Sequence, residues 1–136
     1  MKTLILSVLS ASALFLTGCA HEGARLPVNT TTHDIENTSQ YALEGPRVQK
    51  SVTFSGTLQR FLEDGRLEVV TNVRNRENRR IEVQISCVFK DEQNFATGDE
   101  TPWHTLILTE NAQEGVKFTA MNNRAKNYTI RVREAH

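Results

Sequence analysis

The sequence predicts an all-β fold, a two-sheet antiparallel β-sandwich of about seven strands. From residue 47 onward apolar and polar residues alternate, and this period of two is typical of strands with one buried face. Turn-forming residues separate the alternating segments at intervals of roughly ten residues, as in small sandwiches. After the first 20 residues no segment has the helical spacing of apolar residues. A small β-barrel is the alternative architecture.

The first 18 residues have the pattern of a secretion signal. Lys2 gives the start of the chain a positive charge, and residues 4–16 are apolar apart from three serines. A helix that spans a membrane needs about 20 apolar residues, so this run is too short to remain as an anchor. We therefore expect residues 1–18 to be a signal peptide that is removed.

Residues 16–19, Leu-Thr-Gly-Cys, directly follow the apolar run. They resemble the lipobox of bacterial lipoproteins at each of its four positions, which implies cleavage before Cys19 and acylation of that residue with chains such as palmitate. Stable anchoring takes two or more lipid signals, so three acyl chains hold firmly. Ala20 stands where an Asp favours the inner membrane, so we expect the outer membrane, with the domain facing the periplasm. The alternative is an ordinary signal peptide with an unrelated cysteine.

The segment between the expected anchor and the alternating region has a different composition. Residues 20–46 are largely polar, lack a period and offer little apolar surface to bury. We expect residues 19–46 to form a lipidated, flexible tether that spans about 30 Å as a root-mean-square average. A short ordered piece is expected within it at Tyr41–Leu43. The β-sandwich domain is then expected to cover residues 47–136.

Six or seven short strands are expected in the domain, and turn residues separate them. Asp64 and Gly65 form a turn, and residues 75–79 have the length and polarity of a hairpin connection. The expected strands cover residues 48–54, 57–62, 67–73, 81–89, 106–108, 116–120 and 128–132. A domain of this size closes a core without disulfide bonds, although the margin is modest.

Several segments occur in a particular order after the tether. They are residues 71–75, residues 81–85, Phe89, Asp91, Trp103 and residues 120–125, the last ahead of the final strand. This order resembles the YcfL-like lipoproteins, which are small periplasmic proteins of unknown function. The resemblance covers nearly the whole chain after Cys19 and implies an immunoglobulin-like β-sandwich behind a lipobox. It supplies no catalytic residues.

Composition and cysteine content exclude some classes of function. The formal net charge is zero, so no overall field attracts a polyanion, and we expect no nucleic-acid partner. If Cys19 is acylated, Cys87 has no cysteine with which to pair, although an oxidising periplasm permits disulfides. Cys87 stands between Ile85 and Phe89 in an alternating series. This position predicts a buried core thiol rather than a reactive one.

Few residues suggest catalysis or metal binding. Apart from His136 at the end of the sequence, His104 is the one histidine in the predicted domain, and a structural or solvated role is expected for it. No CxxC, HxH or HExxH spacing occurs, so we expect no metal and no cofactor. Residues 91–100 collect oxygen ligands of the kind that calcium accepts, but a solvated hairpin tip explains the same residues. No serine or threonine has the setting of a nucleophile.

Two features are candidates for partner binding. Arg74, Arg76, Arg79 and Arg80 border the expected hairpin, and four guanidiniums around one end suit carboxylates or phosphates. The alternative is an exposed turn kept in solution by its charge. Trp103 follows a proline at a strand entrance, where packing in the core is the expected role and an interface role is the alternative.

The sequence thus favours a non-catalytic binding or accessory module held at the membrane by a lipid anchor. Its expected partner is another envelope protein or the cell wall, met through a sheet face or a strand edge. Two alternatives stay open. One is a cell-wall or lipid-modifying enzyme, which requires a pocket with convergent titratable groups. The other is a purely architectural envelope protein, since a sandwich fold does not decide function.

Overall fold

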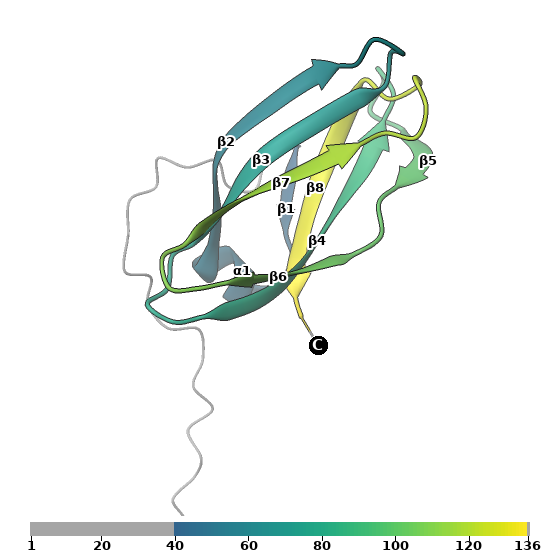
Figure 1. Ribbon diagram of the computed structural model, residues 1–136. Helices are drawn as coiled ribbons and strands as arrows, with labels where there is room; N and C mark the ends of the chain where they lie inside the picture. Colours follow the sequence, from purple (N-terminus) through teal and green to yellow (C-terminus); the bar gives the residue numbers. More distant parts are fainter. Residues whose placement is uncertain (1–39, 136) are drawn as a thin grey trace, which may run out of the picture.

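The computed structural model describes residues 40–135 (Figure 1). The expected signal peptide, Cys19 and most of the expected tether lie outside these residues. No helix in the described part is long and apolar enough to cross a membrane. The described elements are β1 (Tyr41–Leu43), α1 (Pro46–Ser51), β2 (Val52–Phe61), β3 (Leu67–Asn75), β4 (Ile81–Lys90), β5 (Ala96–Glu100), β6 (His104–Leu108), β7 (Gln113–Thr119) and β8 (Asn127–Glu134).

The strands form two sheets that face each other as the layers of a sandwich (Figure 1). In the five-stranded sheet β8 lies between β1 and β4, and β5 and β6 both pair with the other side of β4. The three-stranded sheet has the order β2, β3, β7. The strand pairs are antiparallel except β1 with β8, which run parallel. The predicted all-β sandwich is confirmed, with eight strands among the described residues instead of about seven.

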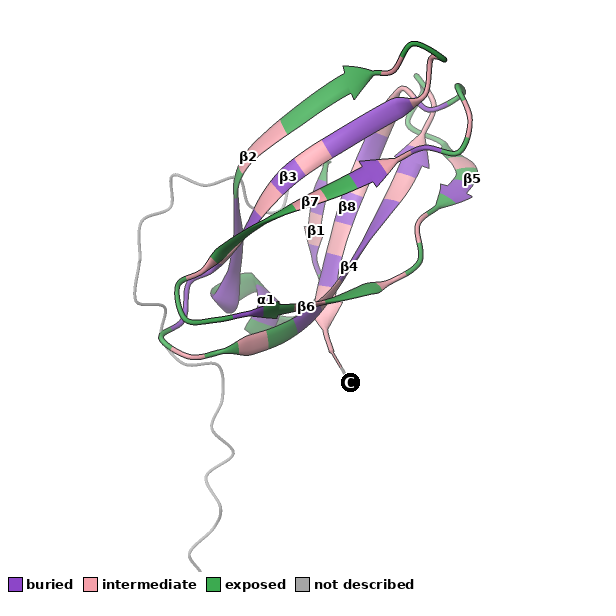
Figure 2. Cartoon of the chain, in the orientation of Figure 1, coloured by how far each residue is buried: buried purple, intermediate pink, exposed green. Residues whose placement is uncertain are grey.

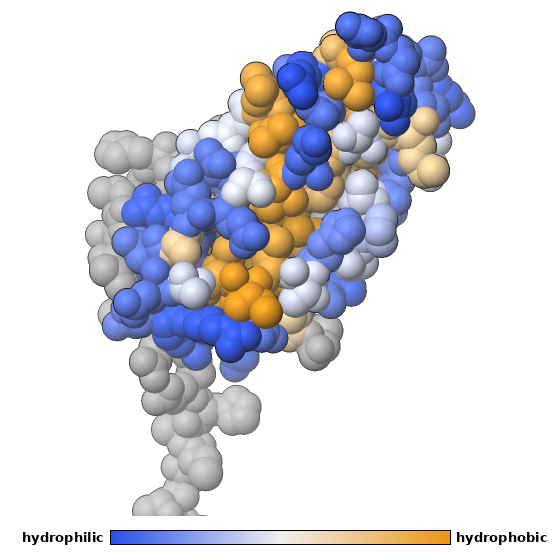
Figure 3. Space-filling view, in the orientation of Figure 1, coloured by the Kyte–Doolittle hydropathy of each residue, from blue (hydrophilic) through white to orange (hydrophobic). Residues whose placement is uncertain are grey.

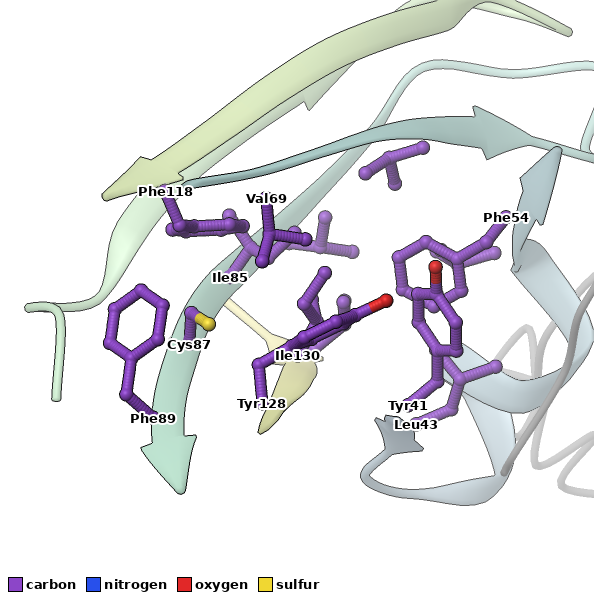
Figure 4. Close-up of a cluster of buried hydrophobic side chains, with 14 of the residues drawn as sticks. Tyr41, Leu43, Phe54, Val69, Ile85, Cys87, Phe89, Phe118, Tyr128 and Ile130 are labelled. Carbon is purple, nitrogen blue, oxygen red and sulfur yellow. The ribbon is translucent and has the colours of Figure 1, made fainter. Parts of the chain in front are cut away.

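Along much of β3, β4 and β8 buried residues alternate with less buried ones, so that every second residue faces the core between the sheets (Figure 2). Ile85, Cys87 and Phe89 of β4 are fully buried, and the predicted core position of Cys87 is confirmed. Tyr41 and Phe54 join the two sheets, with ring centroids 4.2 Å apart (Figure 4). Burying one large apolar side chain contributes about 2 kcal/mol to folding, so these inner faces hold the sandwich together.

A short helix replaces the first part of the first expected strand. A strand was expected at residues 48–54, but residues 46–51 form α1, and only residues 52–54 are strand, as the start of β2. Pro46 suits the first turn of a helix, because its fixed φ is helical and its missing N–H has no partner there anyway. Val48 and Ser51 are the buried residues of α1, and a spacing of three puts them on one helix face. Two buried positions are too few to produce a visible helical period in the sequence.

Two further strands lie where sequence analysis expected a tether and a loop. β1 pairs with β8 in the register Tyr41 to Ile130, so the sandwich includes residues ahead of the expected boundary at residue 47. β5 lies within the acidic segment that was expected to be a hairpin tip. It pairs with β4 through its backbone, and Asp99 is its one buried residue. Without apolar alternation an edge strand of this kind leaves no period to detect.

Candidate functional site

The β3–β4 hairpin holds a buried carboxylate. Glu77 is only 1% exposed, and its two oxygens accept hydrogen bonds from the Ser51 hydroxyl and from Arg79 Nε, the latter at 2.5 Å. Arg80 pairs with Glu82 at 2.8 Å. Two of the four candidate arginines therefore have a carboxylate partner within this hairpin and the start of β4.

The other two candidate arginines are also engaged or enclosed. Arg76 is only 8% exposed, and its backbone N–H donates to Ser51 O at 2.8 Å. Arg74 donates from Nη2 to Asn111 Oδ1 at 3.3 Å. The hairpin neutralises much of its own charge, so the four guanidiniums do not form one free cationic patch.

A pocket of about 240 Å³ lies beside this hairpin, between α1 and the ends of β4 and β8. Ser51 and Glu77 are in its wall, together with the Arg79 guanidinium. Ser51 and Arg79 each bond one oxygen of Glu77, and these two bonds hold the carboxylate in place. Its geometry fits a structural role, in which it ties the end of α1 to the hairpin.

Trp103 lies outside the core, on the outer face of the five-stranded sheet, so the expected core packing is wrong. Its ring stacks on the guanidinium of Arg133 at 4.0 Å and on that of Arg131 at 4.9 Å. The two arginines face outward because they alternate along β8 with the buried Ile130 and Val132. Cation–π contacts of this kind contribute about 0.5–2 kcal/mol each. Trp103, Arg131 and Arg133 together form the tryptophan surface.

Trp103 lies on this outer face because the edge of the sheet is interrupted at residues 101–103, between β5 and β6. Pro102 has no N–H to donate, and proline in sheets is confined to such edges. Thr101 fixes the break: its N–H donates to Cys87 O at 2.9 Å, and its hydroxyl accepts from the Cys87 N–H at 2.8 Å. The Ser86 hydroxyl donates to Thr101 O at 3.0 Å. These bonds hold the backbone directly before Trp103.

Polar neighbours fix both arginines of the tryptophan surface. Arg131 donates from Nη2 to Ser86 Oγ at 3.1 Å and pairs with Glu100. Arg133 donates from Nε to Gln84 Oε1 at 2.9 Å. Sequence reasoning missed these two arginines as site residues. Their outward direction was visible in the alternation of β8, but no sequence signal shows that β4 brings β6 and β8 to its two sides.

The other candidate residues are placed as turn or surface groups. Asp91 Oδ1 accepts from the backbone N–H groups of Gln93 and Phe95, both at 2.9 Å, and Asn94 has a positive φ of 66°. Such bonds are typical of Asp in turns. His104 is exposed at the start of β6. Across residues 40–135 no group of three or more His, Cys, Asp or Glu side chains is arranged to hold a metal ion.

Comparison with known families identifies the domain. The model of the family described as protein of unknown function, DUF1425, matches residues 39–134. The chain belongs to the DUF1425 family. The match begins next to β1, so the DUF1425 domain includes the strand that pairs with β8. No curated protein matches the sequence.

Two crystal structures resemble this DUF1425 domain. One is a DUF1425 family member from Shewanella sp. pv-4, with 22% identity, a TM-score of 0.56, and coverage of 76% of this chain and 88% of that chain. The other is Campylobacter jejuni cj0090, with 17% identity, a TM-score of 0.62, and coverage of 72% of this chain and 100% of that chain. At these identities the likeness shows the fold that the DUF1425 chain shares with them.

Proposed function

We propose that this DUF1425 protein is a lipid-anchored, non-catalytic binding module of the bacterial cell envelope, and that it is one of the YcfL-like lipoproteins. The Leu-Thr-Gly-Cys sequence at residues 16–19 supports acylation of Cys19. The anchor holds the domain on the periplasmic side of the outer membrane. Its partner is another envelope protein or a cell-wall component.

The tryptophan surface is the observation that carries this proposal. A large aromatic side chain stabilises a small domain most when it is buried, yet Trp103 lies outside the core, stacked on two guanidiniums. Tryptophan and arginine are among the residues most enriched at the energetic centres of interfaces. Because hydrogen bonds already fix Thr101 and both arginines, little side-chain entropy is lost when a partner covers this surface.

The chemistry of the surface favours a partner that carries carboxylates. Within the described residues Arg133 makes one hydrogen bond, from Nε, so its two terminal nitrogens are available to a partner. A guanidinium binds a carboxylate with two parallel hydrogen bonds and stacks on aromatic rings at the same time. Acidic proteins and the stem peptides of the cell wall both offer such groups.

Photocrosslinking in living cells tests the proposal with the full-length protein. A photoreactive amino acid is placed at Thr105, which is exposed and in register with Gln84, the partner of Arg133. We expect a covalent adduct that Trp103→Ala reduces about tenfold, because truncation of a central interface residue costs more than about 1 kcal/mol. The matched control carries the same probe at Asn78, which is exposed in the β3–β4 hairpin. If a folded Trp103→Ala protein gave the same amount of adduct, the tryptophan surface would not be the site of partner binding.

The anchor is tested separately. We expect labelled palmitate to enter the wild-type protein and not Cys19→Ala, and the intact mass to correspond to residues 19–136 with acyl chains attached. An unmodified mass would contradict the anchor. The two tests are independent, because crosslinking at Thr105 would still show whether the tryptophan surface binds a partner.

A further inference from the structure

Four strand edges border the two sheets of the described domain, and three of them are protected against pairing with another chain. β1 has three residues, β2 carries a bulge between Phe54 and Thr57, and the break at Pro102 separates β5 from β6. Short, bulged and interrupted edges are the usual protection in β-proteins. The fourth edge is β7, which pairs with β3 along all of its 7 residues without a register shift.

Half of the backbone groups of β7 point to the open side. The N–H of Ala120 donates to Leu67 O in β3 at 2.8 Å, so the even-numbered residues of this segment bond to β3. Because the bonding direction alternates along an antiparallel strand, the N–H and C=O groups of Gly115 and Lys117 point away from β3. An added strand bonds to groups of this kind.

Apolar side chains accompany this edge. Val116 of β7 and Leu106 of β6 are only partly buried, although both pack against the core. Figure 3 shows an apolar band on the face of the molecule that β7 crosses in Figure 1. Contiguous exposed apolar surface on a single domain marks an interaction site.

A charge adds selectivity to the edge. Lys117 is exposed and in register with Val70 of β3, and none of the salt bridges in residues 40–135 involves it. Opposite charges directly across neighbouring strands stabilise their pairing by about 0.2–1 kcal/mol. An added strand therefore gains from an acidic residue opposite Lys117. It gains equally from apolar residues opposite Val116 and Phe118, whose side chains face the inner side.

We propose that β7 binds an extended segment of a partner protein, with alternating apolar and acidic residues, as the fourth strand of the three-stranded sheet. A second copy of the chain fits less well. If the β7 strands of two copies paired antiparallel about a two-fold axis at Val116, Glu114 of each copy would lie opposite the apolar Phe118 of the other. An axis at Lys117 would place the two lysines opposite each other, and like charges directly opposite are destabilising. The site depends neither on Cys19 nor on the tryptophan surface.

Two synthetic peptides of about nine residues test the proposal. One alternates valine and glutamate, and the other has the same composition in an order that breaks the alternation. Each is added to the purified full-length protein, and amide hydrogen exchange is followed residue by residue. We expect only the alternating peptide to bind and to slow exchange at Gly115 and Lys117. The amides of Val116 and Phe118 already bond to β3 and serve as internal controls.

Two substitutions at one position sharpen the test. Lys117→Pro removes an outward N–H without touching the ladder to β3, and Lys117→Glu reverses the charge. We expect each substitution to weaken binding of the alternating peptide, and Lys117→Pro to lower its affinity about tenfold. Lys50→Glu, on the exposed side of α1, makes the same change in net charge and should leave binding unchanged. If Lys117→Pro does not fold, the binding measured with Lys117→Glu still tests the proposal.

Three results would overturn the proposal. The first is equal binding of both peptides, and the second is binding that leaves exchange at Gly115 and Lys117 unaffected. The third is a concentration-dependent dimer in which these amides are slow without any peptide, which would assign the edge to a second copy of the chain.

Discussion

Glu77 carries a buried charge in a segment that reads from the sequence as an exposed turn. The run of arginines and asparagines around it predicts solvent, yet the glutamate is enclosed by Ser51 and Arg79. The partner Ser51 lies in α1, which sequence analysis did not expect. Removing one member of a buried charged group is costly because the remaining members stay desolvated without a partner.

The contribution of this group to stability can be measured. Glu77→Gln should lower the free energy of unfolding by about 2 kcal/mol, because the charge that holds Arg79 and the Ser51 hydroxyl is lost. Urea denaturation gives the value. Glu82→Gln is the control, since Glu82 and Arg80 form an exposed pair worth at most about 1 kcal/mol. Equal losses in the two variants would contradict a structural role for Glu77.

Cys87 illustrates a residue that alternation alone located correctly. Desolvation in the core raises the pKa of its thiol to about 12, and the charge of Asp99 acts in the same direction, whereas Arg131 opposes both. The thiol therefore stays protonated at pH 8, and the thiolate is the reactive form. We expect iodoacetamide to leave Cys87 unmodified in the folded protein and to alkylate it in concentrated urea, as read by mass spectrometry. Rapid alkylation of the folded protein would show that the site opens.

At the scale of elements, alternation was informative where a strand has one face in the core. β3, β4 and β8 follow this pattern closely, and all three were expected. α1 and β5 were missed because each has one or two buried side chains, and such elements are fixed by backbone bonds and neighbouring strands. The position of Trp103 was missed for the same reason. It depends on which strands flank β4, which a single strand's pattern does not contain.

β1 provides a test at this scale. Tyr41 is 1% exposed, contacts Phe54, and its hydroxyl lies 3.4 Å from Thr71 Oγ1. Tyr41→Ala should lower the free energy of unfolding by about 3 kcal/mol, as expected for a buried aromatic side chain. The neighbouring Ala42→Ser, at a partly exposed position of the same strand, should change it by less than about 0.5 kcal/mol. If Tyr41→Ala left the free energy of unfolding unchanged, the stable domain would begin after β1, at the boundary expected from the sequence.

At the scale of the whole molecule, three ionisable groups share the core. Desolvation by burial raises the pKa values of Tyr41, Cys87 and Tyr128 above their ordinary values of 10.0, 9.0 and 10.0. Each group is uncharged when protonated, so the folded state retains protons that the unfolded state releases as the pH rises. The sandwich should therefore lose stability above about pH 9, whereas these groups contribute nothing at neutral pH.

The alkaline loss of stability can be assigned to individual groups. We expect the urea midpoint to fall steadily between pH 9 and about pH 12, and to fall less steeply in Cys87→Ala, which lacks the thiol. Comparison with each variant's own midpoint at pH 7 separates this effect from the cavity that alanine leaves. Identical slopes in the two proteins would mean that Cys87 ionises in the folded state as easily as in the unfolded one.

The class of the fold followed from the sequence because the alternation and turn spacing of about 90 residues permit few other architectures. The arrangement of strands did not follow, since pairing joins distant segments such as β1 and β8, or β3 and β7. The candidate surfaces depend on that arrangement. The tryptophan surface combines β8 with the break before β6. The edge of β7 is open because, within residues 40–135, no strand pairs with its other side.

The parallel pairing of β1 with β8 governs how the domain is made. β8 lies between β1 and β4 and pairs with both of them. While residues 127–134 are still inside the ribosome, β1 has no strand to pair with and the five-stranded sheet lacks the strand that joins β1 to β4. Assembly of this sheet must wait until β8 (Asn127–Glu134) has been synthesised. A premature stop codon ahead of β8 would therefore yield a protease substrate and not a smaller stable fragment.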